Sequence, residues 1–245
     1  MFKKLIDKLK DDPKTIVFTE GTDPRILEAS SRLLAGTFLK PILVGNVEAV
    51  KAAAEEAGYN INGAEIIDPE NFDEMDAMVA QMVELRKGKM TEEQCRAALS
   101  KGNYFGTMLV KMGVADCLLG GATYSTADTV RPALQLIKTK PGISRTSGVF
   151  LMNRENTDHR LVFADCAINI EPNAQELAEI AINTAETAKV FGIDPKVAML
   201  SFSTKGSAKS PKVDRVVQAT NIAKEMRPDL AIDGELQFDA AFVPA

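Results

Sequence analysis

Small polar residues, glycines and cations follow predicted strands at three places along this 245-residue chain. These places are Gly120–Pro132 (GGATYSTADTVRP), Ser201–Ser210 (SFSTKGSAKS) and the short Asp233–Glu235 turn. Ligands of open α/β sheets bind at the carboxyl ends of the strands. Hydroxyls, backbone N–H groups and cations in such loops favour an anionic ligand. Together the three loops predict an α/β protein that binds an anionic ligand.

The first loop has the richest pattern. Ser125, Thr126 and Asp128 stand where a helix is predicted to begin, and Arg131 follows about one turn later. N–H groups at a helix start attract anions, and a guanidinium can form a paired contact with a phosphate or carboxylate. The same residues also fit an ordinary capped helix with a surface arginine, so both interpretations stay open at this point.

The other two loops are more ambiguous. Ser203, Thr204 and Lys205 lie between a predicted buried strand and a predicted helix, which suits an anionic group but also a plain polar connector. The carboxylates of Asp233 and Glu235 could orient a substrate or an arginine, or they could simply turn the chain.

Several chemistries are disfavoured by what the sequence lacks. The single histidine, His159, stands in a charged turn, where a solvated surface residue is the expected state. There is no Ser-His-Asp candidate, no zinc-ligand spacing, no G-x-G-x-x-G and no Walker A pattern. Zinc, nicotinamide and nucleotide-hydrolysis chemistry therefore have no support from sequence motifs.

Composition points to a globular cytoplasmic protein. Hydrophobic residues make up 45% of the chain, charged residues 26%, and the net charge is -5. The absence of a long basic run argues against nucleic acid as a partner, and no apolar stretch is long enough to span a membrane. The odd number of well separated cysteines, Cys95, Cys117 and Cys166, fits a reducing compartment.

The first half of the chain alternates predicted strands and helices, which is typical of a parallel sheet covered by helices. Strands are expected at residues 15–18, 41–45, 64–68 and 115–119. Asp23 with Pro24, and Gly58, mark helix ends between the first three strands. Met-rich residues 73–87 are predicted to form a helix whose apolar face packs in the core.

The second half starts a new unit after Pro141–Gly142. Residues 147–152 and 160–163 are predicted to pair as strands, and Asn173 with Glu176 forms a capping box for a helix that ends at Gly192. Strands at 197–202 and 230–232 flank a helix that begins at Ser210–Pro211. The apolar ending, Ala240–Ala245, carries no predicted helix, and we expect that a following element is absent.

Over several long segments, the chain resembles the phosphate acetyltransferase family. The segments that carry the resemblance are GGATYSTADTVRPALQLIKTKPG (Gly120–Gly142), LVFADCAIN (Leu161–Asn169), LSFSTKGSAKSPKVDRV (Leu200–Val216), RPDLAIDGELQFDAA (Arg227–Ala241) and ELRKGK around Arg86. Phosphate butyryltransferases and the C-terminal domain of some malic enzymes share the architecture.

The resemblance implies a fold of two three-layer α/β domains with mainly parallel sheets, a cleft between them, and a homodimer. The domains would comprise residues 1–143 and 144–245. The family's chain returns to the first domain with a Ser-Arg-Gly phrase that provides the proposed general base, and nothing in this sequence matches that phrase. We therefore expect the base to lie in a C-terminal segment that is absent, and the second domain to be incomplete.

The implied reaction is the reversible transfer of acetyl between coenzyme A and phosphate, without a covalent acyl-enzyme and without a metal. Acetyl-CoA, acetyl phosphate and phosphate are the expected small-molecule partners. By resemblance, Arg131 and Arg86 would bind the anions, and Thr126, Ser203 and Thr204 would line the cleft. Cys166 is interpreted as a buried structural residue. Butyryl transfer and a non-catalytic acyl-CoA-binding module remain as alternatives.

Overall fold

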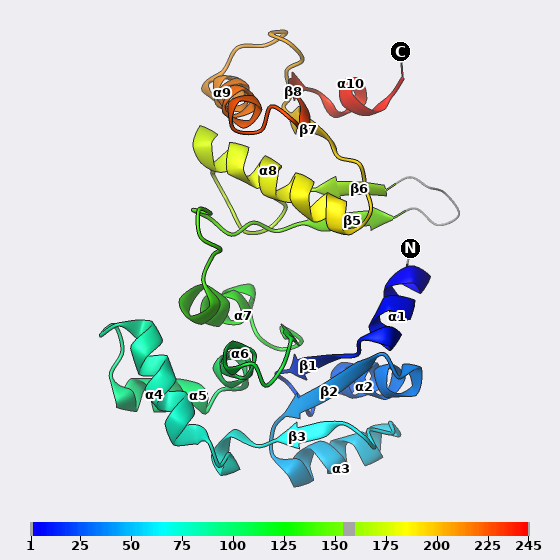
Figure 1. Ribbon diagram of the computed structural model, residues 1–245, viewed down its shortest axis with the longest axis vertical. Helices are drawn as coiled ribbons and strands as arrows, with labels where there is room; N and C mark the ends of the chain where they lie inside the picture. Colours follow the sequence, from blue (N-terminus) through cyan, green and yellow to red (C-terminus); the bar gives the residue numbers. More distant parts are fainter. Residues whose placement is uncertain (1, 154–159, 245) are drawn as a thin grey trace. The chain divides into compact units, whose positions relative to one another are not determined.

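A computed structural model describes residues 2–153 and 160–244, and the chain divides into two compact units, Met1–Lys138 and Thr139–Ala245 (Figure 1). His159, predicted to be a surface residue, lies outside the described residues. In the part of the chain that is described, no helix combines the length and the apolar character needed to cross a membrane.

The first unit is built on a four-stranded parallel sheet in the order β3-β2-β1-β4. Its strands are β1 (Lys14–Phe18), β2 (Leu39–Val44), β3 (Glu65–Ile67) and β4 (Cys117–Leu119). Because all four strands run in the same direction, the loops that follow them meet at one edge of the sheet. The segment after β1 and the segment after β4 are therefore neighbours there.

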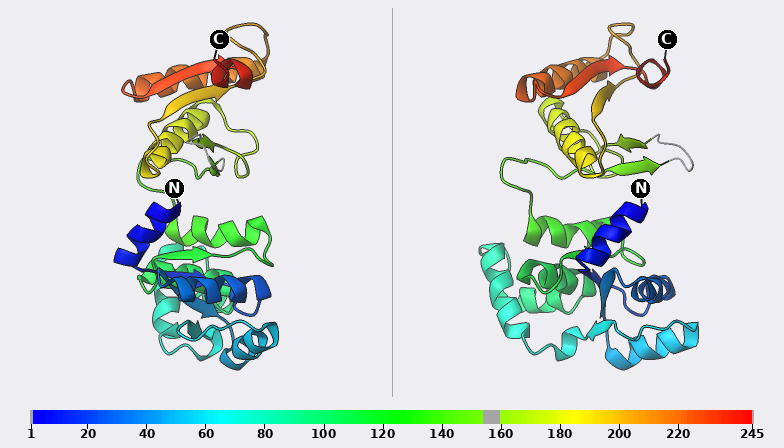
Figure 2. Two further views of the ribbon diagram at one scale, coloured as in Figure 1. Left: turned by 90° about the vertical axis from the view of Figure 1, so that its right-hand side faces the viewer. Right: turned by 45° about the vertical axis from the view of Figure 1, so that its right-hand side comes forward.

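Helices cover both faces of this sheet, which gives three layers (Figures 1 and 2). Alternate residues of a strand point to opposite faces. Val17 and Ile42 pack into a core with Met78, whereas Phe18 and Leu43 pack on the other side. The helical segments are α1 (Phe2–Asp11), α2 (Pro24–Gly36), α3 (Val47–Ala57), η1 (Pro69–Asn71), α4 (Met75–Arg86), α5 (Glu92–Leu99), α6 (Gly102–Met112), α7 (Thr126–Pro132) and the π-helical η2 (Ala133–Ile137).

The second unit contains two separate pairs of strands. β5 (Phe150–Asn153) pairs antiparallel with β6 (Arg160–Phe163), and β7 (Lys196–Leu200) pairs parallel with β8 (Ala231–Leu236). The helices are α8 (Ala174–Val190), α9 (Pro211–Met226) and α10 (Phe238–Phe242). Buried alanines of α8 and α9 allow these two helices to pack closely, with Met199 and Ile232 completing the core.

The predicted α/β class with mainly parallel strand pairing is confirmed. Two predictions about the last residues were wrong. The Asp233–Glu235 segment is not a turn after a strand but part of β8, and the chain forms the short helix α10 where none was expected. The sequence signal for β8 was obscured because a glycine stands between two carboxylates, a combination that is uncommon inside strands.

Candidate functional site

The loop after β4 leads into α7, and the two are fixed by local polar contacts. Ser125 is the N-cap, and its Oγ accepts a hydrogen bond from the Asp128 N–H at 3.1 Å. The same hydroxyl donates to Asp128 Oδ2 at 2.7 Å. From α6, the Asn103 side chain donates to the Asp128 carbonyl at 2.7 Å, which holds α7 against the unit. This region therefore has a defined geometry.

Arg131 lies on the helix that this cap starts, as predicted. Its Nη1 is 3.4 Å from Asp128 Oδ1, and its side chain is 54% exposed. Ser125 and Thr126 are also exposed. The structure thus brings Ser125, Thr126, Asp128 and Arg131 together on the first turns of one helix, with a guanidinium that retains donors for a ligand.

Arg86 is the last residue of α4 and is half-buried. Its Nε donates to the Met90 sulfur at 3.3 Å. The end of α4 adjoins the end of η2, where Lys138 Nζ donates to the Leu85 carbonyl at 3.4 Å. Arg86 therefore belongs to the same unit as Arg131, on an element that packs on the continuation of α7.

Glu20 lies shortly after β1 and faces the loop after β4. Its carboxylate accepts hydrogen bonds from the N–H groups of Gly121, Thr123 and Tyr124 and from the Thr123 hydroxyl. Burial alone would raise the pKa of Glu20, but these donors hold it below its ordinary value. Backbone N–H groups that were expected to meet an anionic ligand already have an acceptor within the protein.

In the second unit, the predicted residues of the 201–210 loop are engaged with β8. Ser203 is fully buried, and its Oγ donates to Glu235 Oε1 at 3.1 Å. Thr204 Oγ1 donates to Gln237 Oε1 at 3.2 Å and accepts from the Gln237 N–H at 2.9 Å. Ser203 thus has an internal partner, while Thr204 is half-buried at the loop surface.

Lys205 is neutralised inside the same unit. Its Nζ is 2.7 Å from Asp233 Oδ1 and donates to the Gly234 carbonyl at 2.9 Å, and Lys224 Nζ approaches the same carboxylate oxygen at 3.1 Å. Hydrogen bonds from Lys205 and Lys224 lower the pKa of Asp233 to about 2. The carboxylate of Asp233 therefore orients two lysines rather than the substrate or arginine considered for it from the sequence.

This ion cluster predicts a pH effect on stability. Since the folded-state pKa of Asp233 is depressed from 3.8 to about 2, its contribution is present above 3.8 and is lost as pH falls through about 2. Asp233→Asn should lower the free energy of unfolding near neutral pH, and the difference from wild type should shrink as pH falls. Urea unfolding between about pH 6 and about pH 2.5 measures this. A difference independent of pH would contradict the prediction.

The prediction that Cys166 is a buried structural residue was wrong, because Cys166 is exposed. It lies in a turn organised by Asp165, whose carboxylate accepts the N–H groups of Ala167, Ile168 and Asn169. Such a turn directs the intervening side chain outward.

Among the described residues, no three or more His, Cys, Asp or Glu side chains are grouped so that they could hold a metal ion.

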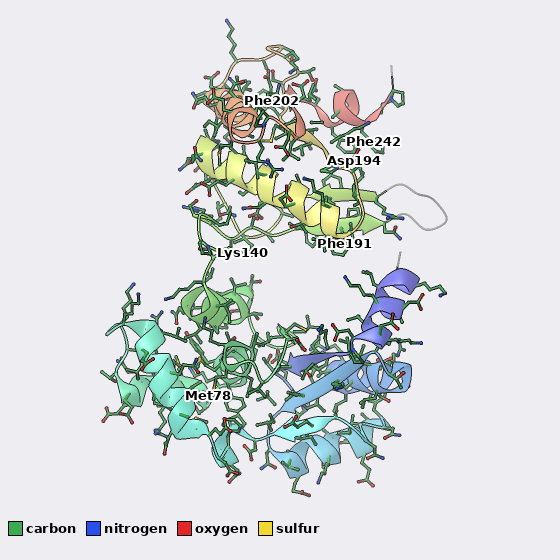
Figure 3. All side chains as sticks on the ribbon, viewed as in Figure 1. Met78, Lys140, Phe191, Asp194, Phe202 and Phe242 are labelled. Atoms are coloured by element: carbon green, nitrogen blue, oxygen red, sulfur yellow. The ribbon has the colours of Figure 1, made fainter. Side chains whose placement is uncertain are left out.

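A groove of about 420 Å³ lies within the second unit. It is lined by β6, β7, the apolar side of α8 and the aromatic side chains of α10, and both Asp194 and Phe242 line it (Figure 3). Phe238 and Phe242 stack with ring centroids 5.3 Å apart. The lining is mostly apolar, with Arg160, Lys196 and Thr184 among the few polar side chains that contribute to it.

Fold and loop together define an α/β protein whose first sheet presents hydroxyls and an exposed arginine at its carboxyl edge. A family-wide sequence pattern described as phosphate acetyl/butaryl transferase matches residues 1–245. The phosphate acetyltransferase of Bacillus subtilis (strain 168) is 56% identical over 245 residues, which are 100% of this chain and 75% of the relative. That of Staphylococcus epidermidis is 50% identical, covering 98% of this chain and 74% of the relative.

Solved structures agree with these relatives. A phosphotransacetylase from Streptococcus pyogenes superposes with a TM-score of 0.92 at 58% identity, covering 100% of this chain and 75% of that one. A phosphotransacetylase from Staphylococcus aureus gives 0.88 at 49% identity, with 99% and 75% covered. This chain belongs to the phosphate acetyl/butaryl transferase family, and the predicted resemblance is confirmed.

Proposed function

We propose that this chain acts as a phosphate acetyltransferase, moving an acetyl group between coenzyme A and phosphate. The observation that carries the proposal is the exposed Ser125–Arg131 turn, in a chain whose whole length is 56% identical to a phosphate acetyltransferase. An exposed guanidinium beside hydroxyls is suited to bind phosphate. Acetyl phosphate carries a phosphate group, and phosphate is the group that leaves.

The reaction requires the coenzyme A thiol to lose its proton to a base. The resulting thiolate attacks the carbonyl carbon of acetyl phosphate, a C–S bond forms, and the C–O bond to phosphate breaks. The leaving phosphate takes that electron pair, so negative charge grows on its oxygens during the step. Preorganised cationic donors stabilise such charge more in the transition state than in the ground state.

We assign this stabilising role to Arg131. Asp128 lies beside the guanidinium and also bonds the cap hydroxyl, so it orients the arginine relative to Ser125. The Thr126 hydroxyl is exposed on the same turn. Arg86 is proposed as a second contact for substrate anions. Ser203, Thr204 and Lys205 of the second unit remain a prediction from the family resemblance.

The proposal includes coenzyme A and acetyl-CoA as substrates that come and go rather than as tightly bound cofactors. It also places the protein in the cytoplasm as a homodimer. The cytoplasmic assignment is supported by the three cysteines, Cys95, Cys117 and Cys166, which are all free thiols.

Thioester formation from coenzyme A, followed by absorbance, tests the function. We expect acetyl phosphate to be used faster than butyryl phosphate, because a pocket shaped for acetyl disfavours two added methylenes by about 10-fold or more. Faster use of butyryl phosphate would replace the proposal by butyryl transfer. Binding of coenzyme A without thioester formation from either phosphate would contradict catalysis by this chain.

A further inference from the structure

Glu20 connects two loops of the first unit that are far apart in sequence. It follows β1 after a single residue, Thr19, and its carboxylate lies against the loop between β4 and α7. Oε2 accepts the Gly121 N–H at 3.0 Å, and Oε1 accepts the Thr123 hydroxyl at 3.0 Å and the Tyr124 N–H at 3.2 Å. The Thr123 N–H donates to the same Oε1.

Arg25, from the same segment as Glu20, holds the loop from a second direction. Its Nη2 donates to the Ala122 carbonyl at 2.7 Å, and Asp23 fixes the guanidinium with two hydrogen bonds, at 2.9 and 2.7 Å. Every residue from Gly121 to Tyr124 therefore has a backbone group bonded to the β1–α2 segment.

The loop depends on such contacts because its own sequence does not fix it. β4 comprises only three residues, and two glycines follow it, of which Gly121 has a φ of +104°. Glycines leave the backbone many alternative conformations. Hydrogen bonds to an ionised acceptor are stronger than neutral ones, so one carboxylate that accepts four hydrogen bonds from this loop selects a single arrangement.

Ser125, the N-cap of α7, is the residue immediately after the Gly121–Tyr124 segment that Glu20 and Arg25 hold. We propose that Glu20 is a positioning residue for the phosphate site: its carboxylate fixes the loop so that Ser125 and Arg131 meet the phosphate in one geometry. This inference rests on the proposed function, since it takes the α7 turn as the phosphate site. Glu20 itself does not touch the substrate, because its oxygens face the loop donors.

The test compares Glu20→Gln and Glu20→Asp with Glu48→Gln, a matched control on α3 whose side chain is 86% exposed. The glutamine side chain has the same shape as glutamate, but its amide N–H groups would face the loop N–H groups, which then lose an acceptor. The aspartate keeps the negative charge on a shorter side chain. Calorimetry gives the dissociation constant for inorganic phosphate on protein shown to be folded by circular dichroism. Hydrogen exchange measures how fast the Gly121–Tyr124 amides exchange in the same samples.

We expect Glu20→Gln to weaken phosphate binding at least about tenfold, equivalent to about 1.4 kcal/mol, and to speed exchange of the Gly121–Tyr124 amides. Glu20→Asp should recover part of the affinity, and Glu48→Gln should match wild type. A purely structural role would speed exchange without changing phosphate affinity in folded protein. That result would overturn the inference.

The two proposals fail in different ways. Wild-type protein that binds no phosphate would contradict the proposed function, and the positioning role with it. If wild type and Glu20→Gln both bind phosphate with the same affinity, the positioning role alone is overturned. If Glu20→Gln does not fold, Glu20→Asp provides the test, and phosphate affinity equal to wild type would then overturn the inference.

Discussion

Arg131→Ala should lower the rate of acetyl transfer by about 10²–10³-fold, the usual effect of removing one preorganised donor from developing negative charge. The guanidinium is 54% exposed and stands 3.4 Å from Asp128, so it is oriented without being buried in a salt bridge. Its removal should leave the fold intact, since few contacts are lost. Initial rates of thioester formation at saturating coenzyme A measure the effect.

Two further variants make this prediction specific. Arg131→Lys keeps the positive charge but loses the planar pair of donors, so it should recover only part of the rate. Arg32→Ala removes a guanidinium on α2 that is 78% exposed and pairs with Glu28, and its rate should stay within about twofold of wild type. Equal losses in Arg131→Ala and Arg32→Ala would show a general charge effect and would count against the assigned role.

Gly120→Ala is expected to destabilise the first unit by about 2–3 kcal/mol, because a Cβ at this position would lie 2.4 Å from the Thr19 hydroxyl oxygen. β1 and β4 are paired directly before this point, so neither backbone can move away without disturbing the sheet. Urea unfolding followed by circular dichroism gives the change in the free energy of unfolding.

A double-mutant cycle identifies the cause. Thr19→Ala removes the atom that Cβ would meet, so Gly120→Ala should cost much less in that background than in wild type. An equal cost in both backgrounds would mean that the close approach to Thr19 is not what requires glycine.

The elements that could be predicted are those whose signals are local. Asp23 caps α2 with Pro24 at its first turn, and α3 ends at Gly58, as the sequence indicates. The capping box at Asn173 is present with both of its hydrogen bonds. Such motifs satisfy backbone groups within a few residues, so their sequence spacing is sufficient evidence. α2 ends at Gly36, and Thr37 after it takes the left-handed conformation.

The features that could not be predicted depend on partners distant in sequence. Glu20 finds its donors about one hundred residues later, and Ser203 finds its acceptor on β8. A glutamate in a Thr-Glu-Gly turn gives no sign of such partners, because only the parallel order of β1 and β4 brings the two loops together. The sequence thus located Ser125–Arg131 but not the carboxylate that fixes their loop.

Release of the coenzyme A thiol from acetyl-CoA, measured as a function of phosphate concentration, tests whether this chain transfers acetyl to phosphate. In this direction phosphate is the nucleophile that accepts the acetyl group. If the chain does so, thiol release should depend on phosphate, saturate as phosphate is raised, and yield acetyl phosphate in equal amount. Thiol release that is independent of phosphate and yields acetate, or no release from folded protein that binds acetyl-CoA, would contradict the proposed function.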